Sequence, residues 1–202
     1  MDSQSYLNEI SMANRPAKKS KIDLFKNKFV LVGIICVAGV ILMAIVGAVL
    51  GGGKSGLKEQ SISLKIRLDS TSEIISNYQG LVKSSYLRSN STSLSGILSN
   101  TNRDLSNYIT EKYKSSDAEK KVQEDEDAHK ANLDSELFEA RINGILDRIY
   151  AHKIAYEVSL IMSMESKLYD ATNDDALKEI LNTSYDSLTV IYEKFENYSE
   201  AK

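Results

Sequence analysis

The sequence predicts an all-α protein with one N-terminal transmembrane helix followed by an antiparallel bundle of about four helices. Three observations predict this fold. Residues 29–53 form an apolar run without a single charged side chain. Residues 54–202 carry apolar side chains at intervals of three and four positions, which is the period of an amphipathic helix. The chain contains one proline, Pro16, so no proline interrupts a helix in those periodic stretches.

The apolar run FVLVGIICVAGVILMAIVGAVLGGG occupies residues 29–53 and is bounded by Lys28 and Lys54. About 20 apolar helical residues are needed to span the hydrocarbon of a bilayer, so this run is long enough to cross one. Cleaved signal peptides have shorter apolar cores, of about 7–15 residues, which favours an uncleaved signal-anchor. Cleavage after small residues near Gly47 and Gly51 is the alternative.

Residues 1–28 are predicted to be a disordered basic tail, because Ser, Asn and Lys dominate and apolar residues are too few for a core. The tail has six basic and three acidic residues, a net charge of +3, which leaves −6 for the rest of a chain whose total is −3. Cytoplasmic flanks of membrane helices are enriched in Lys and Arg, so we expect a cytoplasmic tail and an extracytoplasmic module over residues 54–202. Basic residues beside the bilayer attract anionic headgroups. The acidic module would repel nucleic acid.

Small residues share one face of the predicted membrane helix. Gly47 and Gly51 form a GxxxG pair, and Ala44 and Ala48 form a second pair at the same spacing. Such spacing lets two membrane helices approach closely. We interpret these four residues as a candidate packing face for self-association.

The end of the run, AVLGGGKS at residues 48–55, fits a relaxed phosphate-loop pattern. A phosphate loop requires a buried strand before it and a helix after it, so that backbone N–H groups surround the phosphates. Here a membrane helix precedes the glycines, and the remaining chain predicts helices instead of a nucleotide-binding sheet. We therefore interpret the glycines as a flexible linker and expect no nucleotide binding.

The first helix of the module is predicted from Leu57 to Gln79-Gly80, since glycine is favoured just beyond a helix C-terminus. The apolar alternation over residues 62–68 also fits a strand, but no second good strand exists to pair with it. A second helix is predicted over residues 84–114. It is rich in Ser, Asn and Thr, which are mediocre helix formers, so we expect it to be the softest element.

Residues 115–132 form a run of charged side chains, which we interpret as a solvated helix extension or a loop. Within it, Glu126 and His129 have the ExxH spacing that places two metal ligands on one helix face in ferritin-like bundles. Those sites need a second such pair, and His152 has Ile149, not a glutamate, three residues before it. We therefore expect no metal site and no cofactor.

Residues 134–171 are predicted to form the strongest helix, as one continuous element. Asp134 or Ser135 is expected to cap its start. Gly144 is expected to lie inside it, where it would permit close packing. His152 falls near the apolar face, so we expect a half-buried histidine bonded to a neighbour and regard it as a possible polar site of the bundle.

The last helix is predicted to begin after Asn173, the expected N-cap, and to continue to the end of the chain. Asp174 and Asp175 favour the positive end of that helix. The short connection at residues 171–174 makes it antiparallel to the helix before it. The spacing of the apolar residues fits a compact bundle and an extended coiled-coil stalk equally well.

Two long stretches resemble a known group of proteins: SISLKIRLDSTSEIISNYQGLVKSSYLRSNSTSLSGILSNTNRDLSNYITEKY and ELFEARINGILDRIYAHKIAYEVSLI. The chain is similar there to uncharacterised single-pass proteins that we associate with ultrasmall, Saccharibacteria-type bacteria. The resemblance covers the apolar run and most of the module. It implies a bacterial envelope protein and brings no functional residues with it.

The residues do not predict an enzyme. The chain has two histidines, its only cysteine is Cys36 inside the apolar run, and no nucleophile–base–acid set can be assembled. The first hypothesis is a membrane-anchored, non-catalytic interaction or structural module of the cell envelope. Its partners would be the lipid bilayer and another envelope protein or a second copy. The alternative is an extracytoplasmic four-helix bundle that senses a small ligand and signals through a partner protein, because the tail has no room for an output domain.

Overall fold

The computed structural model describes residues 54–113 and 118–199, and the compact unit Leu50–Lys202 contains both ranges. The predicted tail, the apolar run and its small-residue face lie outside the described residues. Every regular element within those ranges is an α-helix, which confirms the all-α prediction for this part of the chain. None of these helices is both long and apolar enough to span a bilayer. The helices are α3 (Lys54–Tyr78), α4 (Ser85–Lys112), α5 (Ala118–Ile142), α6 (Leu146–Ala171) and α7 (Asp175–Glu196).

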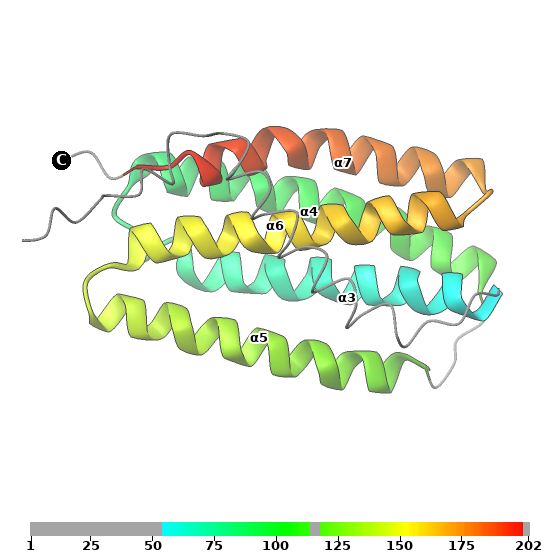
Figure 1. Cartoon of the computed structure of the whole chain (residues 1–202), viewed down its shortest axis with the longest axis horizontal. Coiled ribbons are helices and arrows are strands. Elements are labelled where there is room, and N and C mark those ends of the chain that lie inside the picture. The colour runs from blue at the N-terminus through cyan, green and yellow to red at the C-terminus, as the bar shows by residue number, and fades with distance from the viewer. Residues whose placement is uncertain (1–53, 114–117, 200–202) are drawn as a thin grey trace, which may run out of the picture. The chain divides into compact units, whose positions relative to one another are not determined.

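Four of the described helices close a ring, and α5 lies outside it (Figure 1). Around the ring, α3 packs on α4, α4 on α7, α7 on α6, and α6 on α3. Each neighbour in the ring runs antiparallel to the next (Figure 1). The fifth helix, α5, packs on α3 and, over a smaller area, on α6. The structure is therefore a compact bundle, with one helix more than the sequence predicts.

The core is made of aliphatic side chains that all five helices contribute. Burial of one such side chain stabilises the fold by about 1.5–3 kcal/mol. Fully or almost fully buried examples are Leu64 and Leu68 of α3, Leu94 and Leu98 of α4, Leu137 of α5, Ile154 and Ile161 of α6, and Leu181 and Leu188 of α7. Tyr150 is also completely buried, and its hydroxyl shares a 2.8 Å hydrogen bond with Ser91 Oγ. That bond satisfies the polar end of an otherwise apolar side chain.

The apolar alternation over residues 62–68 belongs to a helix, as predicted, and the fold explains its strand-like pattern. In an α-helix, residues two positions apart point about 200° away from each other, so the apolar positions 62, 64, 66 and 68 fall on two sides of the helix. Three neighbours, α4, α5 and α6, pack on α3, so more than one side of it is covered. Ile62, Leu64, Ile66 and Leu68 are consequently all buried.

The boundaries of the first two helices agree closely with the sequence. The first helix ends at Tyr78, two residues before Gly80. The second begins at Ser85, and Ser84 is its N-cap, with Oγ accepting a hydrogen bond from Leu87 N at 3.3 Å. Side-chain capping of this kind satisfies an N–H group that has no partner inside the helix.

The predicted cap of the last helix is wrong by one residue. Asp174, not Asn173, is the N-cap, and its Oδ1 accepts hydrogen bonds from Ala176 N at 3.1 Å and Leu177 N at 3.4 Å. The reason lies two residues earlier, where Thr172 Oγ1 accepts a hydrogen bond from Asp174 N at 3.1 Å. That bond fixes Asp174 in the capping position and leaves Asn173 exposed.

The predicted single helix over residues 134–171 is also wrong. The chain leaves the helix after Ile142 and re-enters one at Leu146. Gly144 has φ +72°, a left-handed conformation that glycine adopts without steric cost. Gly144 N donates to Arg141 O at 3.1 Å and Ile145 N donates to Ala140 O at 3.0 Å, which is the hydrogen-bond pattern of a Schellman helix end.

This break changes the place of several predicted features. Asp134 and Ser135 lie inside α5 and cap nothing, because α5 already begins at Ala118. The charged run is thus the first half of a helix, in agreement with the helix-extension interpretation over the described residues 118–132. It belongs to α5 and joins no earlier helix.

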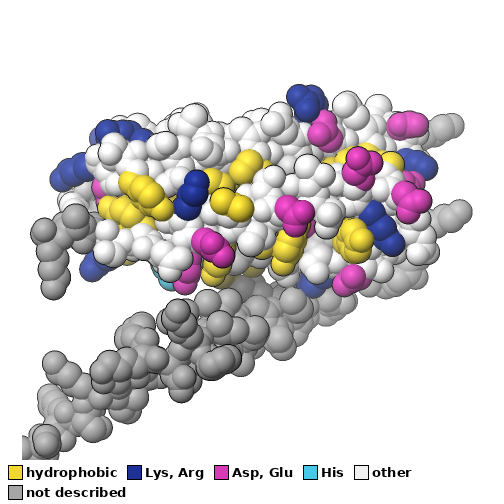
Figure 2. All heavy atoms as spheres, turned by 90° about the horizontal axis from the view of Figure 1, so that it is seen from above, with side chains coloured by type: hydrophobic (Ala, Val, Ile, Leu, Met, Phe, Trp, Pro, Cys, Tyr) yellow, Lys and Arg dark blue, Asp and Glu magenta, His cyan; other side chains and the backbone are white. Residues whose placement is uncertain are grey.

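The face of the bundle at α7 carries both hydrophobic and charged side chains. In the view of Figure 2, hydrophobic side chains on this face form small separate groups between acidic and basic ones. Exposed hydrophobic side chains that are scattered in this way are normal for a protein surface.

We expect Gly144→Ala to lower the free energy of unfolding by about 1–2 kcal/mol, because an L-residue is strained in the left-handed region. A Cβ at this position meets nothing within 4 Å, so the cost comes from the backbone alone. Urea unfolding of the purified full chain measures it. The matched control is Gly96→Ala inside α4, where a Cβ also meets nothing within 4 Å. That change should raise stability by about 0.5–1 kcal/mol. Equal effects at the two glycines would contradict the account.

Candidate functional site

A glutamate lies in the interior of the bundle on α6. Glu165 is 1% exposed, and neither of its carboxyl oxygens makes a hydrogen bond of good geometry with any described residue. No ion pair within the described ranges includes it. Burial raises the pKa of Glu165 to about 8, and the hydroxyl of Ser184 on α7 opposes this rise. At neutral pH this side chain is therefore mostly an uncharged acid in an apolar core.

Two hydroxyl groups continue the polar path from Glu165 across the bundle. Thr101 Oγ1 on α4 donates to Ser184 Oγ on α7 at 2.9 Å, and both residues are buried. Because Ser184 accepts this bond, its own proton is free for another acceptor. Polar side chains from α4, α6 and α7 thus meet in an otherwise aliphatic core.

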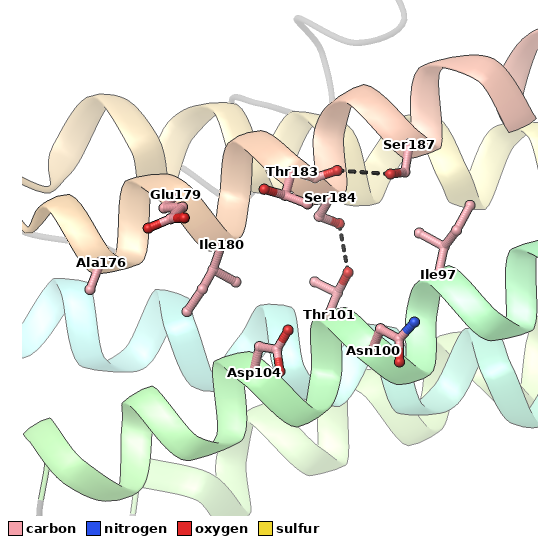
Figure 3. Close-up of a pocket in the computed structure, with 10 residues that line it drawn as sticks. All are labelled: Ile97, Asn100, Thr101, Asp104, Ala176, Glu179, Ile180, Thr183, Ser184 and Ser187. Carbon is pink, nitrogen blue, oxygen red and sulfur yellow. Dashed lines mark hydrogen bonds between the residues drawn. The ribbon is translucent and has the colours of Figure 1, made fainter.

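A groove of about 440 Å³ runs between α4 and α7 over the Thr101–Ser184 bridge (Figure 3). Its lining mixes apolar and polar side chains and carries acidic groups but no basic one. The lining residues are Ile97, Asn100, Thr101 and Asp104 of α4, and Ala176, Glu179, Ile180, Thr183, Ser184 and Ser187 of α7. The two bridging hydroxyls point toward one another across the groove (Figure 3).

A smaller pocket of about 170 Å³ lies between α6 and α7, and we call it the Glu165 pocket. Its lining residues are Glu165, Ser166 and Tyr169 of α6, and Leu181, Asn182 and Tyr185 of α7. Ser184 lines the larger groove and Glu165 lines the smaller pocket. The buried acid and its neighbouring hydroxyl therefore lie between two hollows of the surface.

A second polar group, the Arg67 cluster, connects α5 to the ring. It consists of Arg67 of α3, Glu126 and His129 of α5, and Glu157 of α6. Arg67 Nη2 donates to Glu126 Oε1 at 2.9 Å, and Arg67 Nε lies 2.8 Å from Glu126 Oε2. Arg67 Nη1 donates to Glu157 Oε2 at 3.1 Å. His129 Nε2 lies 2.8 Å from Glu157 Oε1.

In this cluster, burial and the positive charge of Arg67 have opposite effects on the pKa of Glu126. Both glutamates are buried, and one guanidinium serves both of them. For Glu126, burial has the larger effect and raises the pKa, although the adjacent Arg67 lowers it. A buried carboxylate is stable only while its cationic partner remains in place.

The ExxH spacing does place Glu126 and His129 in one cluster with Glu157. Arg67 occupies the position between the two carboxylates that a metal ion would need. Within residues 54–113 and 118–199, no group of three or more His, Cys, Asp or Glu side chains is arranged to hold a metal. The motif contributes to an ion-pair network.

His152 is exposed on α6, so the expectation of a half-buried histidine is wrong. Its neighbours Ala151, Ile154 and Ala155 occupy the buried face at that level. Glu157 and Glu165 were not predicted from the sequence, although a signal was available. With Ile154, Ile161 and Leu168, these two glutamates follow a three–four spacing and therefore occupy core positions.

Comparison of the chain with protein-family models, with curated proteins and with solved structures finds no match. The resemblance to single-pass envelope proteins stays a prediction. The function is therefore inferred from the chain's own residues.

We expect the stability of the protein to fall between about pH 4.5 and pH 8, partly because of Glu165. Its pKa is about 8 in the folded chain and near 4.5 when exposed, so in this range the unfolded chain has released a proton that the native state retains. The stabilisation present below pH 4.5 is lost as pH rises toward 8, by on the order of a few kcal/mol.

The measurement is urea unfolding of the full chain at several pH values. Glu165→Gln should remove this part of the slope, because its amide does not titrate. The control Glu179→Gln makes the same chemical change at an exposed position of α7 and should keep the slope. A slope that is unchanged in Glu165→Gln would show that other groups cause it.

Arg67→Met should lower the free energy of unfolding by about 3–5 kcal/mol, because it leaves two buried carboxylates without their cation. Hydrogen exchange should show that the backbone amides of α5 lose more protection than those of the other described helices. The matched control is Arg103→Met, since Arg103 pairs with Asp104 on the exposed surface at 3.1 Å. Exposed pairs contribute about 0–1 kcal/mol. Similar losses in the two variants would contradict the assigned role of the cluster.

Proposed function

We propose that the chain is a membrane-anchored, non-catalytic interaction module of the cell envelope. In this proposal residues 29–53 cross the membrane, residues 1–28 remain in the cytoplasm, and the helical bundle lies outside. The length of the apolar run and the excess of Lys and Arg before it support this arrangement.

The observation that supports an interaction role is a set of exposed apolar side chains at one end of the bundle. We call it the apolar end. It consists of Leu81, Phe138, Ile142 and Ile145, whose exposed fractions are 41%, 52%, 69% and 37%. They belong to the α3–α4 turn, the last turns of α5 and the α5–α6 turn, which all lie at the left in Figure 1. Several large apolar side chains exposed in the same region are typical of a protein-binding surface.

Hydrogen bonds between side chains and the backbone hold the α3–α4 turn of the apolar end in place. Asp147, in the first turn of α6, accepts hydrogen bonds from Lys83 N at 2.9 Å and Ser84 N at 2.7 Å. Arg88 Nη1 donates to Val82 O at 2.9 Å and Lys83 O at 3.1 Å. A surface fixed in this way loses little conformational entropy on binding.

The charges beside the apolar end indicate the kind of partner. Residues 79–84 and 138–148 contain the exposed basic side chains Lys83, Arg141 and Arg148, and the acidic residues Glu139 and Asp147. The Asp147 carboxylate is already engaged by backbone N–H groups. These two turns are thus locally basic in a module that is acidic overall. They fit a protein partner with an apolar patch and an acidic rim.

The position of the anchor agrees with this role. The predicted membrane helix leads directly into Lys54, where α3 begins. Lys54 lies at the opposite end of the bundle from the two turns (Figure 1). A helix of 25 residues is about 37 Å long, so the apolar end is distant from the point of attachment.

The test is cross-linking of the full chain on intact cells with a membrane-impermeant reagent. We expect a heteromeric product with the unaltered chain, reduced by about tenfold or more in Phe138→Ser/Ile142→Ser, because a few central apolar residues dominate most interfaces. Both residues are exposed, so this variant should fold normally. The control is Val190→Ser, at a residue of α7 that is 56% exposed.

Three outcomes would contradict the proposal. Product that forms only after cell lysis would place the bundle in the cytoplasm. Only monomer, or only a cross-linked homodimer, would exclude a separate partner protein. Equal yields from the double variant and the Val190→Ser control would place the interface elsewhere.

The second candidate function is ligand sensing, and the groove over the Thr101–Ser184 bridge favours it, because it combines apolar side chains with polar ones. Ligand sites between the helices of a bundle combine apolar walls with a few converging polar groups. In this case a small molecule would change the yield of the cross-linked product. A yield that no added small molecule changes would count against it.

A further inference from the structure

Glu165 is a buried acid for which the described bundle supplies no counter-charge. Both carboxyl oxygens are inaccessible and lack hydrogen bonds of good geometry. Proteins leave few buried polar groups in this state, and an absent bound molecule is one of the established reasons. In the Arg67 cluster, by contrast, each buried glutamate contacts a guanidinium. No described residue forms an ion pair with Glu165, so an incoming cation would meet a carboxyl group that is not already paired.

The walls of the Glu165 pocket suit a cation as well. Tyr169 and Tyr185 are 39% and 38% exposed, so both rings are partly open to solvent. The faces of aromatic rings attract organic cations. The Tyr169 ring already does so, since Lys178 Nζ lies 5.2 Å from its centroid. Asn182 adds an amide oxygen that can accept a hydrogen bond.

The volume of the Glu165 pocket and the oxygen atoms that line it limit which cations can bind there. A volume of about 170 Å³ is several times the roughly 30 Å³ that one water occupies in the liquid, so it holds a short chain of atoms. A divalent metal prefers several oxygen ligands, whereas this pocket has one carboxylate. An ammonium group has three N–H donors, which the carboxylate and the amide oxygen can accept, while its alkyl chain contacts Leu181.

We propose that the Glu165 pocket binds a primary alkylammonium group, with the Glu165 carboxylate as its counter-ion and Tyr169 and Tyr185 at its sides. The group comes from a free small amine or from a lysine side chain of another polypeptide. This site goes beyond the interaction role of the apolar end and gives the second candidate function a ligand class. It is separate from the apolar end, so the cross-linking test and the binding test can fail independently.

The test is isothermal titration calorimetry on the full chain in detergent micelles. The probes are n-butylammonium, its neutral counterpart n-butanol, and two short peptides that carry lysine or Nε-acetyl-lysine. We expect n-butylammonium to bind and n-butanol not to bind under the same conditions. Glu165→Gln should weaken binding by about tenfold or more, since it removes the one acidic side chain in the pocket lining. Glu193→Gln, which alters an exposed residue near the C-terminal end of α7 that lines neither pocket, should bind like the unaltered chain.

A second readout is independent of the variants. The free Glu165 carboxyl is mostly protonated at pH 7, since burial raises its pKa to about 8. Binding of an ammonium group should therefore release a proton, which appears as a dependence of the binding heat on the ionisation enthalpy of the buffer. Tyr169, Tyr185 and Lys178 are the other titratable groups around the pocket.

Each outcome decides the proposal. Binding of the lysine peptide, but not of its acetylated form or of free n-butylammonium, would assign the site to a polypeptide partner. Binding of n-butylammonium alone would assign it to free amines. Equal affinity for n-butanol, equal affinity of Glu165→Gln, or binding without proton release would overturn the proposal, as would a failure of every probe to bind.

Discussion

One guanidinium determines where α5 lies. Arg67 contacts a glutamate of α5 and a glutamate of α6, so it holds the fifth helix against the ring from the inside of the interface. Between Val122 and Leu133, α5 contributes one hydrophobic side chain to the core, the partly buried Val122. Its attachment there therefore relies strongly on the Arg67 ion pairs, which are more directional than apolar packing. The last turns of α5 carry two residues of the apolar end, so that surface also depends on Arg67.

The bundle contains buried acids in two contrasting environments on the same helix. Glu157 contacts Arg67 and His129 of its cluster. Glu165, eight residues further along α6, is influenced by the Ser184 hydroxyl and forms no ion pair with any described residue. A paired buried carboxylate orients its neighbours, whereas an unpaired one remains protonated until a cation arrives. The first arrangement serves assembly of the fold, and the second is suited to binding.

Local sequence predicts those parts of the fold that local physics determines. The ends of α3 and the Ser84 cap depend on residues within one turn of them, and both are close to the prediction. The break at Gly144 was missed because glycine is tolerated inside a helix and apolar periodicity continues on both sides of it. Only the direction in which α5 and α6 pack makes the left-handed conformation necessary. Asp174 is the cap instead of Asn173 because Asp174 N donates a hydrogen bond to Thr172 Oγ1. The sequence alone does not show which of the two residues makes this bond.

The polar sites were harder to predict than the helices. A charged run was expected to be solvated, yet Glu126 within it is buried, because its partner Arg67 is distant in sequence. His152 attracted interest for its place near an apolar stripe, whereas His129 is the histidine that contacts a buried acid. Glu157 and Glu165 occupy core positions of the stripe and could have been identified from spacing alone. Which of them has a cation beside it depends on tertiary structure.

The closed ring has a consequence for the order of folding. The α3–α4 and α6–α7 hairpins each bring neighbouring segments together, and such local contacts form fast. The contact between α3 and α6 joins the hairpins across a long loop that contains α5, and its closure carries an entropic cost. The two hairpins can therefore form before the ring closes, and α5 must also pack on α3 and α6 before the fold is complete. The apolar end is complete only after α5 has packed on the ring and paired with Arg67. A chain that is still folding therefore does not yet present this binding surface.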